Sequence, residues 1–477
     1  FTLDGTTLAL SSGNFTVDVA GDIALDAAGT EVQLFKSGTK FGKFTTNSTP
    51  LGFYIDAEIS DGDMFFRGND GGAQITALTL DMSEAGTATF NHDVKLPSGG
   101  NLFFTSGSSF SPRLSNSNSD TALSFFTNNT ERFQIATDGG LHVLTPGTSN
   151  VRLGVNAGDS ITSGTNYNVC IGDEAGTALN GGDNNTAVGY QALATENANS
   201  NNTAIGHQAL KDQDGGDGNT AVGSFAIHDL TNASRATAVG SYAGFSNLGA
   251  DDVTFIGHNT GLFATTAAYS VFVGSKAGQG ITGTKLTGNH NVAIGFSAGL
   301  LLQGTATENV LVGSYAGDAI TTGSENVCMG LGAGGSINTG TRNVCLGDDA
   351  GNQITTATRS IAIGHIAMGQ TAVTGEANIA IGNQCGNSML AGSLNVMVGE
   401  GAGKSINSGA RNTCIGPFSG DAITTALDNV TVGYLAGTYN VDLITGNYNT
   451  LLGAYCHTSA TNSTQQIVMG HNVTGNG

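Results

Sequence analysis

Short apolar segments alternate with polar stretches of about eight residues from about residue 150 to the end of the sequence. The apolar segments share one motif, N-[T/V]-[A/C]-[V/I]-G-x-x-A-G, with variants such as "NVCIGDEAG" at 168 and "NTAIGHQAL" at 202. The central glycine of the motif, here called position 0, recurs 19 times from Gly154 to Gly470. Successive glycines are 17 or 18 residues apart, except for 21 before Gly295 and 20 before Gly453. Such a short, regular repeat is typical of a solenoid.

Each motif predicts a short strand that is apolar on both faces. Position −3 is Thr, Val or Ile, and position −1 is Val, Ile, Leu or Met, in every copy. β-Branched residues favour strands, and alternation places these two positions on one face. Position −2 points the other way and holds Ala, Cys, Phe, Leu or Met in most copies. Both faces of the strand must therefore be covered.

Three further positions of the motif predict its turns and its polar contacts. The central glycine fits a sharp bend or a close approach of two backbones. Alanine at position +3, present in 14 of 19 copies, fits a tight corner. Asparagine at position −4, also present in 14 of 19 copies, is expected to stack on its equivalents and to form hydrogen bonds along the ladder. The variable residues between motifs are expected to form outward loops.

The repeat thus predicts an all-β fold, a parallel β-solenoid or β-roll rod with one coil per 17–18 residues. At about 4.8 Å per coil the rod would be roughly 90 Å long. The second apolar face predicts that several chains associate, and three is the preferred number because a closed ring hides that face economically. The alternative is a monomeric solenoid, which would leave that face exposed to aggregation.

The first 149 residues have a different composition, with 15 of the 22 phenylalanines and four of the five prolines. Apolar and polar residues alternate at 6–27, at 77–96 and in "ERFQIATDGGLHVL" at 131, which predicts strands. We therefore expect short β-rich shaft modules in 1–98, a β-rich connecting module in 99–149, and the solenoid in 150–477, with a boundary near "TPGTSN" at 145.

The net charge and the apolar runs of the sequence argue against nucleic acid and membranes as binding partners. The 477 residues include 73 glycines and carry a net charge of −21. This charge repels nucleic acid and anionic membranes, so neither is an expected partner. The longest apolar runs fall short of the ~20 residues of a membrane span, so we expect no insertion into a membrane.

Several residues resemble parts of functional motifs without completing them. "VMVGEGAGKS" at 396 lacks the first glycine of a phosphate loop because Val398 stands there, and both it and "GLGAGG" at 330 are copies of the repeat. "DQDGGDGN" at 212 resembles a calcium loop, but Gly216 stands where an EF-hand needs an oxygen ligand, and Thr220 replaces the last aspartate of G-G-x-G-x-D.

Cysteine and histidine also follow the repeat. Four cysteines occupy position −2 and two occupy position +3, which predicts small buried side chains rather than disulfides or a zinc site. Four histidines, His207, His258, His365 and His471, directly follow a central glycine and lie three or more coils apart. We therefore predict no catalytic, cofactor-binding or metal-binding residue and no enzymatic activity.

The repeat resembles two related families. It is similar to the head repeats of trimeric autotransporter adhesins, which are shorter, and more closely to the "NTAVGYQAL"-type repeats of tail-fibre proteins of tailed, especially marine, bacteriophages. The upstream segments at 77 and 131 also look like the β-rich shafts of such fibres. The resemblance implies a homotrimeric fibre in the virion tail that contacts baseplate or tail proteins and binds a host-surface glycan or protein.

Two alternatives remain open at this point. One is a bacterial or archaeal trimeric adhesin or extracellular filament at the cell surface. The other is a tailspike that degrades glycans, which would need paired acidic residues in a groove.

Overall fold

The computed structural model of the chain describes residues 31–48, 51–81, 87–90, 102–103, 113–115, 123–127, 130–135, 141–143, 147 and 149–476. Every regular element within these residues is a β-strand, which confirms the predicted all-β class. The chain divides into two compact units, residues 1–102 and 103–477.

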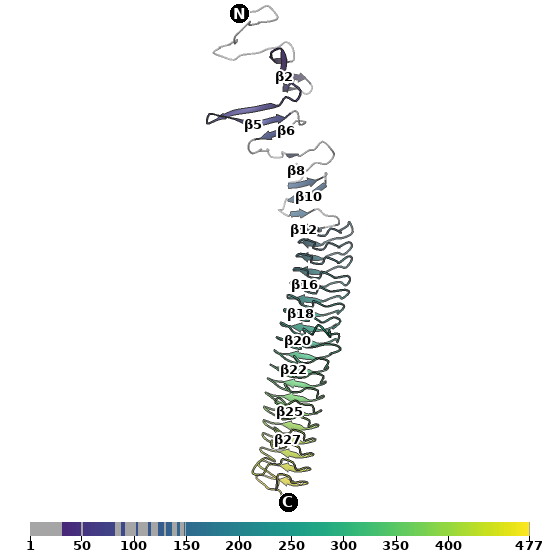
Figure 1. Cartoon of the computed structure of the whole chain (residues 1–477), viewed down its shortest axis with the longest axis vertical. Helices are drawn as coiled ribbons and strands as arrows, with labels where there is room; N and C mark the ends of the chain where they lie inside the picture. The colour runs from purple at the N-terminus through teal and green to yellow at the C-terminus, as the bar shows by residue number, and fades with distance from the viewer. Residues whose placement is uncertain are drawn as a thin grey trace, which may run out of the picture. The chain divides into compact units, whose positions relative to one another are not determined.

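The first unit contains two antiparallel sheets of three strands each (Figure 1). The strands are β1 (Glu31–Lys36), β2 (Thr39–Ser48) and β3 (Leu51–Ala57) in one sheet, and β4 (Met64–Asp70), β5 (Ala73–Asp81) and β6 (Thr87–Phe90) in the other. The predicted strands at 77–96 correspond in their described part to β5 and β6, whereas those at 6–27 lie outside the described residues.

A third sheet has the strand order β11-β10-β9-β8-β7. Its strands are β7 (Leu102–Phe103), β8 (Arg113–Ser115), β9 (Leu123–Thr127), β10 (Thr130–Ile135) and β11 (Leu141–Val143). β10 and β11 pair in an antiparallel manner, with Phe133 opposite Val143. The alternation in "ERFQIATDGGLHVL" therefore predicted two real strands.

The repeats form a single parallel sheet of 19 strands in sequence order, which confirms the predicted solenoid (Figure 1). Each strand has three residues, positions −3 to −1. The strands are β12 (Val151–Leu153), β13 (Val169–Ile171), β14 (Thr186–Val188), β15 (Thr203–Ile205), β16 (Thr220–Val222), β17 (Thr237–Val239), β18 (Thr254–Ile256), β19 (Val271–Val273), β20 (Val292–Ile294), β21 (Val310–Val312), β22 (Val327–Met329), β23 (Val344–Leu346), β24 (Ile361–Ile363), β25 (Ile379–Ile381), β26 (Val396–Val398), β27 (Thr413–Ile415), β28 (Val430–Val432), β29 (Thr450–Leu452) and β30 (Ile467–Met469).

The register of this sheet is uniform even where the repeat is longer. The coil before Gly295 has extra residues, yet Val271 still pairs with Val292 and Val273 with Ile294. The additional residues are accommodated away from the strand, where Leu286 forms isolated parallel bridges. Insertions therefore enlarge a loop and leave the strand ladder intact.

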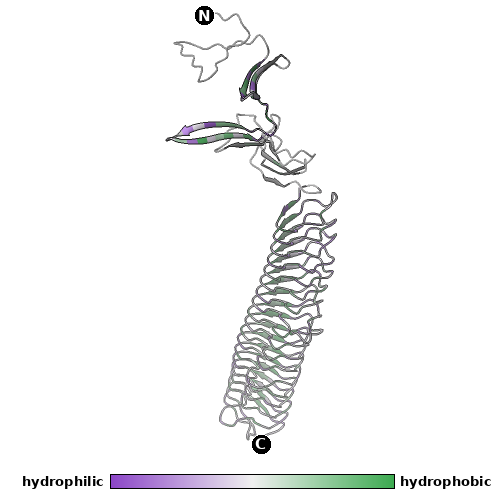
Figure 2. Cartoon of the chain, turned by 45° about the horizontal axis from the view of Figure 1, so that its top comes forward, coloured by the Kyte–Doolittle hydropathy of each residue, from purple (hydrophilic) through white to green (hydrophobic). Residues whose placement is uncertain are grey.

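The core lies inside each coil, between the strand and the segment that returns below it. Position −2 is buried in every coil after the first, as at Cys170, and position +7 on the return segment supplies the opposing layer, as at Leu179. A Cβ added to Gly176 would lie 2.7 Å from Cys170 Sγ and 2.8 Å from Leu179 Cδ1, so the two side chains meet beside this glycine. Figure 2 shows the apolar residues gathered along the stack of strands.

Two core positions, −2 and +4, exchange volume from coil to coil. Where position −2 is phenylalanine or methionine, position +4 is glycine, and a Cβ on Gly278 would lie 2.5 Å from the ring of Phe272. Where position −2 is alanine, as at Ala187, position +4 can be the buried Leu193. Because protein interiors are close-packed, the "NTAVGYQAL" variant keeps the same core with its bulk moved to the other position.

The asparagines at position −4 form the predicted ladder. Asn326 Oδ1 accepts hydrogen bonds from the backbone N of Asn343 at 3.0 Å and from its Nδ2 at 3.1 Å. Asn326 Nδ2 in turn donates to the carbonyl of Gly340 at 2.9 Å. These side chains are fully buried. Each ladder asparagine thus supplies partners to backbone groups that water cannot reach.

The central glycines allow adjacent coils to approach closely. Gly330 has φ of +140°, and a Cβ at this position would lie 2.3 Å from the carbonyl oxygen of Gly347. Both the backbone conformation and the contact exclude a side chain. The bend and close approach predicted for the motif glycine are therefore both present.

Candidate functional site

The segment that resembles a phosphate loop has its backbone donors already engaged. The N–H groups of Gly399, Gly401 and Gly403 donate to carbonyls of neighbouring coils at 2.8–2.9 Å. The N–H of Lys404 donates to Gly401 at 3.2 Å, and that of Ser405 to a neighbouring coil at 3.0 Å. A phosphate loop needs such groups to point at the ligand. This segment therefore has the structure of an ordinary corner of the repeat.

The six cysteines are free and buried, in the positions that the repeat assigned to them. Burial raises the pKa of Cys385 to about 12 and that of Cys414 to about 11. Burial also raises the pKa of Cys170 to about 11, although nearby Arg152 acts in the opposite direction. Such thiols are poor nucleophiles and poor metal ligands at neutral pH.

The four histidines that follow a central glycine are exposed at the corners of separate coils. His365 Nε2 lies 3.8 Å from Asp348 Oδ2 in the adjacent coil. His207 contacts two rings of adjacent coils, with centroid distances of 5.5 Å to Tyr190 and 4.9 Å to Phe225. The structure brings none of these four histidines together with another.

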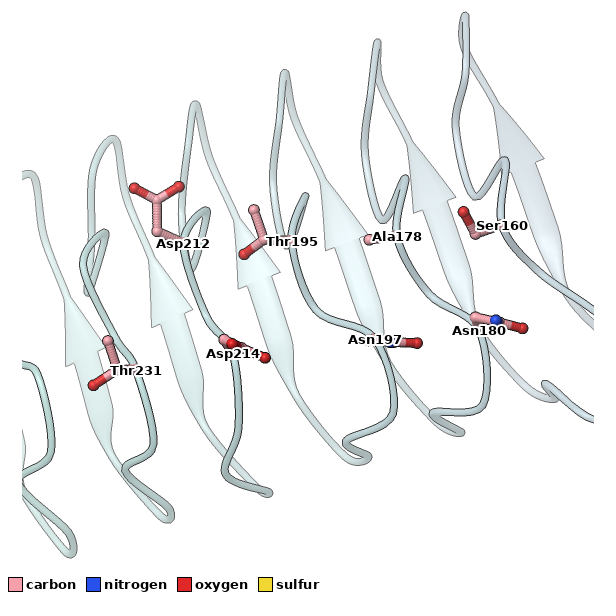
Figure 3. A pocket seen from close by; sticks show the side chains of 8 residues that line it. All are labelled: Ser160, Ala178, Asn180, Thr195, Asn197, Asp212, Asp214 and Thr231. Carbon is pink, nitrogen blue, oxygen red and sulfur yellow. The ribbon is translucent and has the colours of Figure 1, made fainter.

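The return side of the first five coils carries an open groove of about 740 Å³ (Figure 3). Its lining consists of side chains at positions +6 and +8, which flank the buried position +7 and therefore point outward. The lining residues are Ser160, Ala178, Asn180, Thr195, Asn197, Asp212, Asp214 and Thr231. Hydroxyl, amide and carboxylate groups thus face solvent along the side of the coil opposite the strand.

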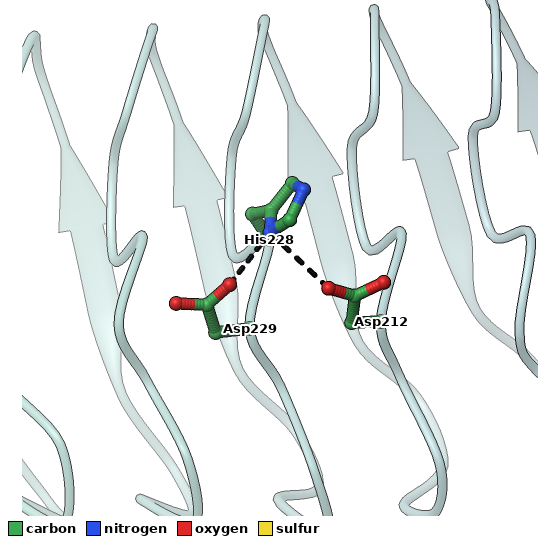
Figure 4. A group of neighbouring side chains, drawn as sticks. All are labelled: Asp212, His228 and Asp229. Carbon is green, nitrogen blue, oxygen red and sulfur yellow. Dashed lines mark hydrogen bonds and ion pairs between the residues drawn. The ribbon is translucent and has the colours of Figure 1, made fainter.

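Three ligand-type side chains meet at one end of this groove (Figure 4). His228 Nδ1 lies 2.6 Å from Asp229 Oδ1 and 3.6 Å from Asp212 Oδ2. Asp212 belongs to the coil of Gly206, and the other two belong to the next coil. Within the described part of the chain this is the one group of three or more His, Cys, Asp and Glu side chains spaced to hold a metal ion.

The carboxylates of residues 212–219, the segment that resembles a calcium-binding loop, do not come together among themselves as ligands for a metal ion. Asp212 and Asp214 both line the groove, whereas Asp217 Oδ1 accepts a hydrogen bond from the backbone N of Ser200 at 2.7 Å. Gln213 turns inward, where its Nε2 donates to the carbonyl of Gly216 at 2.7 Å. Asp212 therefore finds its neighbours in the next coil rather than in its own loop.

An aromatic cluster adjoins the three side chains. The ring of His228 stacks on Phe245 with centroids 5.1 Å apart and an interplanar angle of 16°, and it lies 5.7 Å from Phe225. Phe225 also stacks on Tyr242 at 4.9 Å. These rings belong to successive coils and fix the orientation of the imidazole.

Sequence reasoning missed His228 and Asp229. The signal was present, because position +6 of one coil lies beside position +6 of the next, so that Asp212 and Asp229 become neighbours once the period is known. His228 at position +5 then falls between them. The histidines that stand out in the repeat occupy position +1, whereas His228 occupies position +5.

Comparison with protein-family models, with curated proteins and with solved structures finds no match to the chain. None of the described residues belongs to a helix that is long and apolar enough to cross a membrane.

Proposed function

We propose that this chain is a structural fibre protein, the homotrimeric tail fibre of a tailed bacteriophage, that attaches the virion to its host. A β-solenoid rod is compatible with a fibrous structural or adhesin protein. The observation that carries the proposal is the outer face of the solenoid sheet, formed by positions −3 and −1 of all 19 coils. We call it the strand face.

The strand face is apolar and half-exposed in the single chain. At position −1, Ile205, Ile256, Ile294 and Ile415 are 39–41% exposed, whereas position −2 beneath them is buried. Complete burial of such a side chain is worth about 1.5–3 kcal/mol, so covering the remaining two fifths contributes about 0.6–1.2 kcal/mol per residue. Summed over the nine coils in which position −1 is exposed, this is about 5–11 kcal/mol per chain, an upper estimate.

Association costs roughly 4–15 kcal/mol, and in a trimer each of the three chains contributes burial energy of this order. A second copy of the chain is the occupant that matches the strand face along its length, because it has the same period. Three copies around an axis cover all three strand faces in a closed ring. Three identical return sides would then point outward, and they can bind repeated host-surface groups with avidity.

The assembly is tested by the mass of the purified chain in solution, from sedimentation equilibrium. The expected mass is three times the 48.0 kDa of one chain. The variant Ile205→Lys/Ile256→Lys/Ile294→Lys places three charges on the strand face and should shift the mass toward that of a monomer. A wild-type chain that is a well-behaved monomer would refute the assembly.

A matched control places the same three charges on the return side, in the variant Asn180→Lys/Asn197→Lys/Asn407→Lys. All three asparagines are exposed at position +8. This variant should remain trimeric. If it dissociates as well, added charge rather than the strand face controls the mass.

Attachment is a separate claim and has a separate test. Fluorescently labelled trimer should bind to host cells at low nanomolar concentration, and the monomeric variant should bind much more weakly because avidity is lost. Baseplate or capsid genes next to the gene for this chain would favour the phage fibre. An anchor domain encoded in the full-length gene would favour the cell-surface adhesin instead.

A further inference from the structure

We propose that Asp212, His228 and Asp229 bind a divalent transition-metal cation of the Zn²⁺ type, a site that departs from the expectation drawn from the sequence. The ligand atoms are Asp212 Oδ2, His228 Nδ1 and Asp229 Oδ1, and all three lie within 4.8 Å of one another. The proposal does not depend on the assembly or on host attachment.

The spacing of these atoms suits such a cation. With metal–ligand distances of about 2.0–2.2 Å, neighbouring ligand atoms around Zn²⁺ lie roughly 3.0–3.5 Å apart. The two distances from His228 Nδ1, 2.6 and 3.6 Å, bracket this range. The oxygens of Asp212 and Asp229 lie no more than 4.8 Å apart, so a bound ion would draw these two partly exposed carboxylates together. One imidazole and two carboxylates also match the preference of Zn²⁺ for nitrogen and oxygen donors.

The imidazole is held in place before any metal arrives. The His228 side chain is only 12% exposed, and Phe245 and Phe225 pack against its ring. Its Nδ1, rather than Nε2, is therefore directed at the two carboxylates. The other oxygen of Asp212, Oδ1, lies 3.6 Å from Lys211 Nζ, which leaves Oδ2 for the site.

The site also spans two coils and is open to solvent. Asp212 comes from one coil and His228 and Asp229 from the next, so a bound ion would join adjacent coils in addition to the hydrogen bonds between them. The two carboxylates are partly exposed, which leaves coordination positions for water or for an oxygen-rich ligand. Because position +6 points away from the strand face, the site stays accessible in a trimer that assembles through that face.

The test uses the purified full chain, freed of metal with a chelator and titrated with Zn²⁺ by isothermal calorimetry. One ion per chain is expected, with a dissociation constant in the micromolar range, and Co²⁺ should give visible absorption bands. His228→Ala should weaken binding at least about 100-fold, since it removes a direct ligand. Asp229→Asn should weaken it as well and is the variant that best preserves the fold.

A matched control is His258→Ala, which removes an exposed corner histidine outside the cluster and should leave Zn²⁺ binding unchanged. Bound Zn²⁺ should also slow amide hydrogen exchange in the coils of Gly206 and Gly223 and not in distant coils. A dissociation constant for Zn²⁺ above about 100 µM would overturn the proposal. Zn²⁺ binding that His228→Ala leaves unchanged would also overturn it. Ca²⁺ binding of equal strength in the wild type and in His228→Ala would count against it in the same way.

Discussion

The substitution Asn326→Ala should remove one member of the asparagine ladder and lower the local stability of the solenoid. Asn326 Oδ1 accepts from the backbone N of Asn343, and Asn326 Nδ2 donates to the carbonyl of Gly340. Alanine removes both partners and leaves the backbone of the two coils otherwise unchanged. The Asn343 N–H and the Gly340 carbonyl then lose these hydrogen bonds in an interior that excludes water.

The size of the effect follows from the number of backbone groups that lose a partner. A buried donor or acceptor without a partner costs about 1–3 kcal/mol, so two of them cost about 2–6 kcal/mol. The middle of that range, about 4 kcal/mol, corresponds to roughly a thousandfold change in an equilibrium constant. Because each coil contacts mainly its neighbours, the loss should be confined to the coils next to the substitution.

Amide hydrogen exchange measured by mass spectrometry reports this local free energy directly, provided that reclosing is faster than exchange. Peptides that cover residues 326–345 should exchange roughly a thousandfold faster in Asn326→Ala, and peptides from distant coils should not change. The control Asn197→Ala removes an exposed asparagine and should leave exchange unaffected. If exchange at 326–345 changed by less than about tenfold, the ladder would contribute little and the reasoning would be wrong.

Three further predictions concern other features of the coil. Gly330→Ala should lower the Tm measured by circular dichroism, because a Cβ would lie 2.3 Å from the carbonyl of the next coil. Cys385 and the other five cysteines should resist iodoacetamide at pH 8 in the native protein and react after denaturation, since burial raises the pKa of Cys385 to about 12. Arg411→Ala should leave the Tm nearly unchanged and raise the pKa of Asp428 measured by NMR, because the hydrogen bond from Arg411 lowers it and both side chains are solvent-accessible.

Each of these predictions has an outcome that contradicts it. Gly283→Ala, at a glycine with open space around it, should leave the Tm unchanged, and an equal loss in both variants would count against the close-approach explanation. Rapid alkylation of native protein would show that coils open readily. The stabilising effect of the Arg411–Asp428 pair should be present above the ordinary pKa of aspartate and be lost as the pH falls through the lowered value, so a loss at alkaline pH would contradict it.

The solenoid was predictable because its signals are local and repeated. Threonine, valine or isoleucine at position −3 and valine, isoleucine, leucine or methionine at position −1, with glycine at position 0, recur often enough to give the strand, its register and the coil length. The return segment was harder to predict. Its buried residues at position +7 include apolar side chains such as Leu179 but also the polar Glu196, which is held by the backbone N–H groups of Ala198 and Asn199. A row with such mixed chemistry has no simple periodic pattern.

The candidate site was not predictable from any one segment. Asp212 and His228 are sixteen positions apart, and nothing in the residues around either one indicates the other. Their contact exists only because one coil is seventeen residues long at this place and both positions lie on the return side. A search of the sequence that compares each residue with those one coil away would have found it.

The strand face and the return side of the coils differ in how much their residues vary. This difference indicates different roles for the two sides. The strand face carries Thr, Val or Ile at position −3 in all 19 coils, whereas position +6 includes Ser160, Ala178, Thr195 and Asp212 in the first four coils. A face that packs against other copies of the chain must be apolar at every level, because every level of it is removed from water. A face that meets outside molecules has no such requirement and can change from coil to coil. The uniform side is therefore suited to the proposed assembly and the variable side to the proposed binding. If both proposals hold, substitutions at position +6 should change binding without changing the number of chains in the assembly.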